Sequence, residues 1–166
     1  MLRRRGLCGG SVMKLKLRGF EKISKYKDVE FPMPARKTKT SAGYDICVPE
    51  DVALRPGRLV MVPTGVKAYM QADEFLGVHI RSSMAVKKSL RLVNNVGIID
   101  ADYYNNPDNE GHIMLAIVNT GMQPLVLKKG ERVAQGIFYK YLTADDDDKT
   151  EKEDRSGGFG STGTKQ

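Results

Sequence analysis

Between residues 44 and 142, apolar and β-branched residues gather in short runs that end at Gly, Pro or Asn, and no long stretch repeats with a helical period. These runs predict short strands joined by tight turns, because Gly and Pro favour turn geometry. The predicted strands cover residues 44–48, 59–70 with a turn at 63–65, 75–81, 113–119 and 132–141. The pattern therefore predicts an all-β chain, built as a sandwich or a jelly-roll-like β-barrel.

One short helix is expected over residues 83–89, directly after a predicted strand. Arg81, Ser82 and Ser83 stand at this junction, and Ser82 or Ser83 can cap the helix with its hydroxyl. The first N–H groups of a helix attract anions, so the segment suits a phosphate. Taken alone, it more often marks a plain N-cap beside a surface arginine.

The length of 166 residues is typical of one domain with an adequate hydrophobic core. Cys8 and Cys47 form no C-x-x-C pair, and Cys47 stands in an apolar run where a small buried thiol is expected. No stretch approaches the roughly 20 apolar residues that cross a bilayer, and the N-terminus lacks the apolar run of a secretory signal. We therefore expect a soluble, cytoplasmic protein without membrane contact.

The net charge of +7 is concentrated at the N-terminus, where residues 1–20 carry +6 and leave +1 for the rest of the chain. A basic arm of this kind can tether nucleic acid or resemble a transit segment. Its glycines and its lack of periodicity favour an unstructured extension over residues 1–12, before Met13, a second candidate start. We therefore do not expect nucleic acid as a partner.

The end of the chain changes character twice. After a barrel over residues 13–143, residues 144–154 form an acidic run that indicates a flexible tether. Residues 155–166 are glycine-rich, yet they include Arg155, Phe159 and the adjacent hydroxyl side chains of Ser161 and Thr162. This end is either disordered or an arm that closes over a phosphorylated ligand, because glycine lets backbone N–H groups approach anionic oxygens.

The segment from Asn94 to Tyr104 is apolar in its middle and polar at its ends. As an extended strand it would carry Asp100 and Asp102 on one face. Two acids at this spacing can bind a metal, supply a general base or cap a turn. Gly97 inside the strand pattern suggests that a ligand or another backbone comes close.

Three further polar residues are unremarkable by themselves. Asp45 is typical of a turn at the start of a strand, and Arg132 and Gln135 are typical of solvent-facing strand positions. His79 and His112 form no metal cluster with a cysteine, and no Ser-His-Asp order stands out. Nucleophilic catalysis and a zinc site are therefore not expected.

Taken together and in order, five segments resemble the five motifs of the trimeric dUTP diphosphatase (dUTPase) family. They cover residues 42–46 (AGYDI), 81–85 (RSSMA), 94–103 (NNVGIIDADY), 132–135 (RVAQ) and 157–163 (GGFGSTG). The resemblance implies a jelly-roll-like β-barrel and a homotrimer, in which three active sites lie between subunits. It also implies that the C-terminal arm of one chain closes a site built by others.

The resemblance further implies that the enzyme hydrolyses dUTP to dUMP and pyrophosphate, which supplies dUMP for thymidylate synthesis and keeps uracil out of DNA. Asp100 matches the general base that activates a water for in-line attack on the α-phosphorus. Mg²⁺ would be held by the triphosphate and by waters, with Asp45 in its outer shell. No protein cage for the metal is then needed.

The other family positions divide by the part of dUTP that they would contact. The hairpin that reads uracil would comprise Asn94, Gly97, Ile98 and Ile99, with Met114 on the following strand, and Tyr103 would pack on the deoxyribose and exclude a 2′-hydroxyl. Arg81, Ser82, Ser83 and Gln135 match phosphate-binding positions. In the arm, Phe159 would stack on uracil beside Gly160, while Arg155, Ser161 and Thr162 would hold the β- and γ-phosphates.

The chain departs from the family pattern at two places. Residues 104–110 intervene before Gly111 where the family continues with Arg-Gly, which predicts a longer hairpin loop. Arg155 lies four residues before Phe159 rather than the common five.

Two other functions remain as alternatives. A dCTP deaminase shares the fold and the Arg-Ser-Ser segment but requires a glutamate as proton shuttle. A nucleotide sensor would use the same pocket as a switch, with residues 104–110 contacting a regulatory protein partner.

Overall fold

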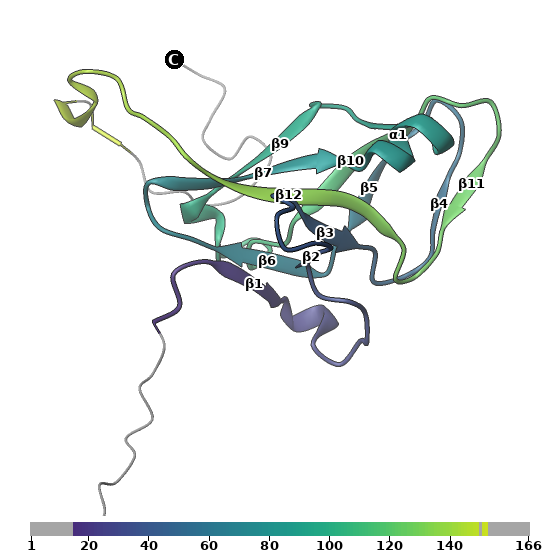
Figure 1. The fold of residues 1–166 in the computed structure, drawn as a ribbon, viewed down its shortest axis with the longest axis horizontal. Helices are drawn as coiled ribbons and strands as arrows, with labels where there is room; N and C mark the ends of the chain where they lie inside the picture. Colours follow the sequence, from purple (N-terminus) through teal and green to yellow (C-terminus); the bar gives the residue numbers. More distant parts are fainter. Residues whose placement is uncertain (1–14, 150, 153–166) are drawn as a thin grey trace, which may run out of the picture.

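A computed structural model describes residues 15–149 and 151–152, and Figure 1 shows that the described chain is built almost entirely of strands. The all-β prediction with one short helix is confirmed. The strands are β1 (Gly19–Lys22), β2 (Ala35–Arg36), β3 (Tyr44–Cys47), β4 (Val52–Leu54), β5 (Leu59–Pro63), β6 (Val66–Tyr69), β7 (Glu74–Ile80), β8 (Leu90–Leu92), β9 (Val96–Asp100), β10 (Met114–Asn119), β11 (Leu125–Leu127) and β12 (Arg132–Lys140). The helix is α1 (Ser82–Lys88), and short 3-10 turns are η1 (Ser24–Tyr26), η2 (Ala101–Tyr103) and η3 (Asp147–Lys149).

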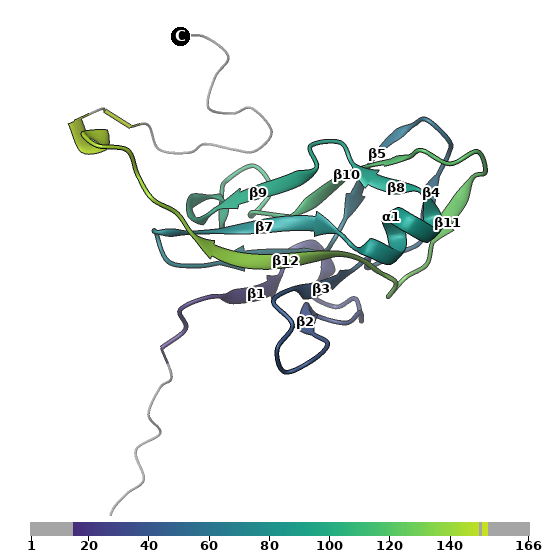
Figure 2. The same ribbon diagram turned by 45° about the horizontal axis from the view of Figure 1, so that its top comes forward.

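The strands form a five-stranded sheet in the order β2-β3-β12-β7-β9, a three-stranded sheet in the order β5-β10-β8, and the two pairs β1-β6 and β11-β4. All strand pairs are antiparallel. In Figure 2, β9, β7 and β12 run side by side, so strands far apart in the sequence are neighbours in the sheet. The crossovers between non-consecutive strands fit the jelly-roll-like fold that the sequence predicted.

The hydrophobic core lies between the sheets and follows the period of two that strands impose. In β10, Leu115, Ile117 and Asn119 are buried, while the residues between them are half-buried. Leu76 of β7 and Val133 of β12 join the same core cluster, and both are fully buried. Burying each such side chain contributes roughly 1.5–3 kcal/mol. The core therefore fixes β7, β10 and β12, the strands beside which the predicted site residues lie.

The helix does not begin as the sequence suggested. Arg81 occupies the N-cap position with an extended backbone (φ −71°, ψ 141°), and its side chain makes no capping hydrogen bond. The carbonyl of Arg81 already accepts from the N–H groups of Met84 and Ala85, at 2.9 and 3.0 Å. The prediction of a serine N-cap was therefore wrong, because Ser82 and Ser83 are the first two residues of the helix itself.

The expected common face of Asp100 and Asp102 was also wrong. Strand β9 ends at Asp100, and the chain turns directly into η2 at Ala101. The change from strand to turn breaks the alternation that would have aligned the two carboxylates.

The first described residues form part of the barrel. Glu74 is buried at 4% exposure and accepts hydrogen bonds from Nε of Arg18 at 3.0 and 3.1 Å. The Arg18 guanidinium lowers the pKa of Glu74, because it favours the charged carboxylate. Strand β1 follows and pairs with β6. The sequence pattern did not predict β1, whereas β6 lies within the predicted strand over residues 59–70. No helix among the described residues is long and apolar enough to cross a membrane.

Candidate active site

A cavity of about 210 Å³ opens beside the hairpin that joins β8 to β9. The turn is tight, because Asn95 adopts a left-handed backbone (φ 60°) and the Val96 N–H donates to the carbonyl of Asn94 at 2.6 Å. The cavity is lined by Asn94, Gly97, Ile98, Ile99, Asp100, Tyr103 and Met114. The structure therefore brings together, in one cavity, all the residues predicted from the sequence to contact the base and sugar within the described part of the chain, together with Asp100.

Gly97 lines this cavity with its backbone. A Cβ atom at Gly97 would lie 3.6 Å from Cβ of Val78 and farther from the other neighbours, which is ordinary contact. The packing of the protein therefore has room for a Cβ atom at this position. A glycine that the packing does not demand is expected where a ligand approaches the backbone closely.

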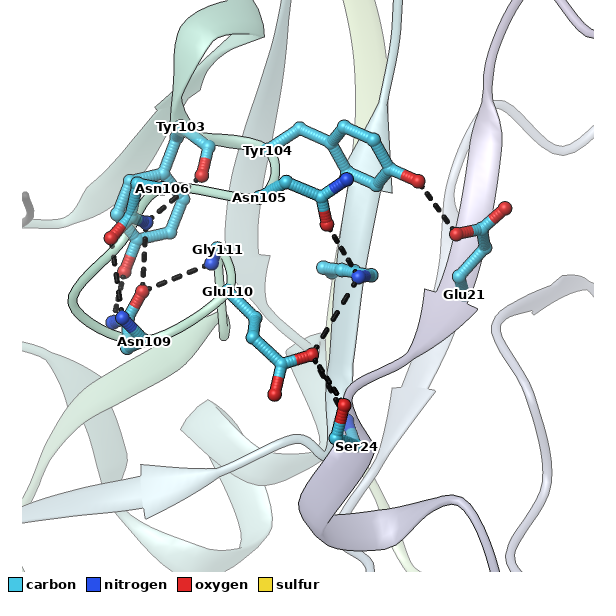
Figure 3. A network of polar contacts seen from close by, with 10 residues as sticks. Glu21, Ser24, Tyr103, Tyr104, Asn105, Asn106, Asn109, Glu110 and Gly111 are labelled. Carbon is cyan, nitrogen blue, oxygen red and sulfur yellow. Dashed lines mark hydrogen bonds and ion pairs between the residues drawn. The ribbon is translucent and has the colours of Figure 1, made fainter.

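Tyr103 forms one wall of the cavity and is held by hydrogen bonds from the loop that follows it (Figure 3). Its side chain is 6% exposed, and its hydroxyl donates to the carbonyl oxygen of His112 at 3.0 Å. The same hydroxyl accepts from Nδ2 of Asn109 at 2.8 Å. The phenol is therefore fixed through both its proton and an oxygen lone pair.

Asp100 stands where the hairpin meets this wall. It is the last residue of β9 and the N-cap of η2, and it is half-buried at the edge of the cavity. Asp102, two residues later, is exposed and does not line the cavity. The two aspartates therefore occupy different environments, and only Asp100 faces the space in which a ligand can bind.

A second group of predicted residues gathers around Asp45. Its carboxylate is 14% exposed and accepts from Nε of Arg81 at 3.0 Å and from Nη1 of Arg132 at 2.9 Å. Arg81 also donates from Nη1 to the carbonyl oxygen of Arg132 at 3.3 Å. One carboxylate thus holds two guanidinium groups in fixed orientations, and the cluster retains a net positive charge suited to an anion.

Gln135 of β12 pairs with Asp45 of the neighbouring strand β3. A Cβ atom at Gly43 would come within 2.4 Å of the Gln135 amide oxygen and 3.1 Å of its Cβ. The glycine at position 43 therefore makes room for the Gln135 side chain. Arg132 and Gln135, which seemed ordinary strand residues in the sequence, lie in the same cluster as Arg81.

Arg81 and Asp100 lie at opposite ends of one strand. Arg81 directly follows β7, whereas Asp100 of β9 pairs with Phe75 near the beginning of β7. Arg81 follows Phe75 by six positions of extended strand, which corresponds to about 20 Å. A single chain therefore holds Asp100 and Arg81 apart, while Gly97, at the other end of the cavity lining, pairs with Val78.

Five predicted arm residues lie outside the described residues: Arg155, Phe159, Gly160, Ser161 and Thr162. Sequence reasoning missed Asn106, Asn109 and His112, which support Tyr103. Their only sequence signal was the turn-forming composition of residues 104–111, which does not show what the side chains bind.

A β fold with a cavity on a tight hairpin and a separate arginine cluster has the features expected of a nucleotide-binding protein. Within this class, the dUTPase family model matches residues 29–163. The chain is 54% identical over 149 residues to the deoxyuridine 5′-triphosphate nucleotidohydrolase of Lactococcus lactis subsp. lactis, covering 90% of this chain and 99% of the relative. The chain therefore belongs to the dUTPase family, a family of nucleotide hydrolases.

Solved structures agree with this assignment. The crystal structure of dUTPase from Streptococcus mutans is 51% identical with a TM-score of 0.73, covering 76% of this chain and 98% of that one. The dUTPase from phage phi11 of S. aureus, 21% identical with a TM-score of 0.66, covers 78% of this chain and 94% of its own, and it shares the fold. A mutant of that phage enzyme, 20% identical with a TM-score of 0.64 and covering 78% of this chain and 94% of its own, is described as coordinating a structural Mg(II) ion.

Proposed function

We propose that this chain hydrolyses dUTP to dUMP and pyrophosphate, with Asp100 as the general base. The observation that carries the proposal is the cavity, which unites the β8–β9 hairpin, Tyr103 and Asp100 in one place. A carboxylate at the rim of a nucleoside-sized cavity is positioned to act on a group attached to the nucleoside.

The chemical step requires one proton acceptor beside the α-phosphorus. Asp100 takes a proton from a water as the water oxygen bonds to the α-phosphorus. The bond between that phosphorus and the bridging oxygen of the β-phosphate breaks in line, and pyrophosphate leaves with the electron pair. Atoms and charge balance without a covalent enzyme intermediate, so no nucleophilic side chain is needed.

Selection of uracil follows from the position of β9. This strand is at the edge of the five-stranded sheet, and among residues 15–149 it pairs only with β7. An edge strand presents backbone N–H and C=O groups on its outer side. Gly97, Ile98 and Ile99 can therefore read the polar edge of uracil, with Asn94 and Met114 on the cavity walls. Cytosine would mismatch these donors and acceptors, and buried unpaired polar groups are costly.

Binding of the phosphates is assigned to the arginine cluster. Arg81 is oriented by Asp45, and Ser82 and Ser83 begin α1, where backbone N–H groups lack helical partners. Gln135 adds an amide donor beside them. We assign closure of the site to Arg155, Phe159, Gly160, Ser161 and Thr162, which would stack on uracil and clamp the outer phosphates.

Mg²⁺ fits the donor set as an ion held mainly by the substrate. Mg²⁺ prefers oxygen ligands and retains several waters, so one or two carboxylates plus phosphates suffice. Asp45 is the carboxylate in the arginine cluster, and it would contact the ion through water. The ion would neutralise the triphosphate and align it for attack. The side chains would then bind and orient dUTP, and Asp100 would deprotonate the attacking water.

The separation of Arg81 from Asp100 supports a site shared between subunits of a homotrimer. The two residues belong to opposite ends of β7, about 20 Å apart along the strand. One triphosphate cannot reach both within a single chain. A second copy that docks its arginine cluster against the cavity of the first would complete the site.

The assignment of the base is tested by Asp100→Asn, with the exposed Asp102→Asn as the matched control. With Mg²⁺ present, Asp100→Asn should abolish pyrophosphate release while leaving dUTP binding largely intact, and Asp102→Asn should hydrolyse dUTP near the wild-type rate. Normal turnover by Asp100→Asn would contradict the assignment. Deletion of residues 155–166 should remove most activity without lowering the unfolding temperature, and full activity of that truncation would contradict the role of the arm.

A further inference from the structure

We propose that Asn109, supported by Asn106, is a positioning residue that holds the Tyr103 ring against the cavity and thereby sets the preference for deoxyribose over ribose. The proposal deepens the proposed function, because it rests on Tyr103 as the wall that meets the sugar. It concerns the loop of residues 104–111, where the chain departs from the dUTPase family pattern.

The orientation of the Asn109 amide is dictated by a backbone donor. The Gly111 N–H, which can only donate, lies 3.0 Å from Oδ1 of Asn109. The amide oxygen must therefore face Gly111, which turns the NH₂ group toward the Tyr103 hydroxyl at 2.8 Å. Asn109 is consequently the donor and the phenol oxygen the acceptor in this hydrogen bond.

Asn106 locks the same arrangement from the other side. Its Oδ1 accepts from the backbone N–H groups of Asp108 and Asn109, at 3.0 and 3.2 Å. Its NH₂ group therefore donates, to the carbonyl of Tyr103 at 3.0 Å and to Oδ1 of Asn109 at 2.8 Å. Two buried or half-buried amides thus interlock around the tyrosine, as Figure 3 shows, and each one fixes the orientation of the other.

The donor and acceptor roles in this hydrogen-bond network determine where the Tyr103 hydroxyl proton points. Because Asn109 donates to the Tyr103 oxygen, the hydroxyl proton must point elsewhere, and it reaches the carbonyl of His112 at 3.0 Å. The ring is pinned at its far end by a donor and an acceptor on two different loop residues. A tyrosine held in this way cannot tilt without breaking buried hydrogen bonds, so the wall that it forms in the cavity is rigid.

The loop has a second set of contacts that does not touch Tyr103. The Tyr104 hydroxyl donates to Glu21 at 2.6 Å, and the Glu110 carboxylate accepts from the N–H and hydroxyl of Ser24 at 3.1 and 2.9 Å. Lys67 lies 3.7 Å from the same carboxylate. These contacts anchor the outer edge of the loop to β1, η1 and β6, and they provide controls for loop stability.

A rigid wall discriminates by exclusion. A 2′-hydroxyl requires extra room beside the sugar, and a ring that can tilt provides it. Loss of one hydrogen bond in a buried network changes an equilibrium constant by up to roughly tenfold. Loosening the ring should therefore lower the deoxyribose preference by up to about tenfold, mainly by improving ribonucleotide binding.

The informative substitution is Asn109→Ala, which removes the amide donor to the Tyr103 hydroxyl and puts no new acceptor in its place. We would measure the ratio of UMP to dUMP dissociation constants by titration calorimetry on the full chain. The ratio should fall by up to about tenfold in Asn109→Ala and remain at the wild-type value in Tyr104→Phe and Glu110→Gln. A ratio that stays unchanged in Asn109→Ala, or that falls equally in the two controls, would overturn the proposal.

Tyr103→Phe gives an independent route to the same result, because it removes the hydroxyl and leaves the loop intact. It should lower the UMP-to-dUMP ratio as Asn109→Ala does, and the double variant should show no further fall. Additive effects would mean that Asn109 acts elsewhere and would overturn the proposal. Both ligands lack a scissile phosphoanhydride, so these ratios are measured independently of turnover. A wild-type chain that prefers dUMP but releases no pyrophosphate from dUTP would contradict the proposed function alone.

Discussion

Arg81 and Asp100 are held at opposite ends of β7, the first directly after its last residue and the second paired with Phe75 near its start. Antiparallel pairing of β7 with β9 makes this separation a property of the sheet rather than of a flexible loop. In the proposed homotrimer, a triphosphate that meets both residues would lie between two copies of the chain.

Complementation of two inactive variants follows from this geometry. Arg81→Ala and Asp100→Asn should each be inactive alone, because each removes one half of every site. Unfolded together and refolded, the two should recover about a quarter of wild-type activity, since each half of a shared site is intact with a probability of about one half. Pyrophosphate release measures the recovery. No recovery from a mixed oligomer would place both residues of a site in one chain.

Gly97→Ala should separate binding from folding. A Cβ at Gly97 meets only ordinary contacts, so the unfolding temperature should change little, while a methyl group on this cavity-lining residue should weaken dUTP binding. Gly111→Ala is the matched contrast, because Gly111 has φ +81° and its Cβ would lie 2.5 Å from the carbonyl oxygen of Tyr103. Thermal unfolding and nucleotide titration distinguish them. Unimpaired dUTP binding by Gly97→Ala would show that the ligand does not approach this backbone.

Asp45→Asn should weaken binding and orientation of the triphosphate. An Asn amide offers one acceptor oxygen to the two arginines that Asp45 now binds, so Arg81 or Arg132 loses its partner. A hydrogen bond to a charged group contributes about 1.5–3 kcal/mol, so kcat/KM should fall by roughly 10- to 100-fold. The Mg²⁺ concentration for half-maximal activity should also rise. Asp51→Asn, which affects an exposed pair with Lys128, is the control. Wild-type kinetics of Asp45→Asn would exclude both roles.

His112 should make stability depend on pH below neutrality. Burial, with a smaller contribution from Lys25, lowers the pKa of His112 from 6.5 to about 4, while Glu110 and Glu50 oppose the shift. Between these values the unfolded chain binds a proton that the folded chain does not. The stabilisation is therefore fully present above about pH 6.5 and is lost as the pH falls toward 4, at up to about 1.4 kcal/mol per pH unit.

His112→Gln is the matching variant for this prediction. Glutamine can still accept from the Gly65 N–H, which now donates to Nε2 of His112 at 3.0 Å, but it does not titrate. Denaturant unfolding at pH 7 and pH 5 should show a smaller loss of stability in His112→Gln than in the wild type. Equal losses in the two proteins would assign the acid sensitivity to other groups.

The longer strands and the cavity residues could be predicted from the sequence. Runs such as residues 75–81 and 132–141 are largely apolar, and the bounds of β7 and β12 differ from them by at most one residue at each end. Short strands such as β1, β4 and β11 escaped prediction, because three or four residues show too little periodicity. The break after Asp100 escaped it as well, since Ala101 and Asp102 carry no strong turn signal.

The sequence pattern could not predict which side chains meet when they lie far apart in the sequence. Asp45 and Arg132 meet because β3 pairs with β12, 87 residues away along the chain. The clamp around Tyr103 depends on amide orientations that only the folded loop defines. The residue types around Asp45 and around Tyr103 could be seen in the sequence. Their contacts depend on the sheet register and on the closure of the loop.

The central claim is tested most directly by nucleotide-specific hydrolysis. The purified chain with Mg²⁺ should release pyrophosphate from dUTP but not from dTTP, dCTP or UTP. The hairpin would reject the two other bases, and the fixed Tyr103 ring would reject the ribose. Release of ammonia from dCTP, or comparable release of pyrophosphate from all four nucleotides, would contradict the account.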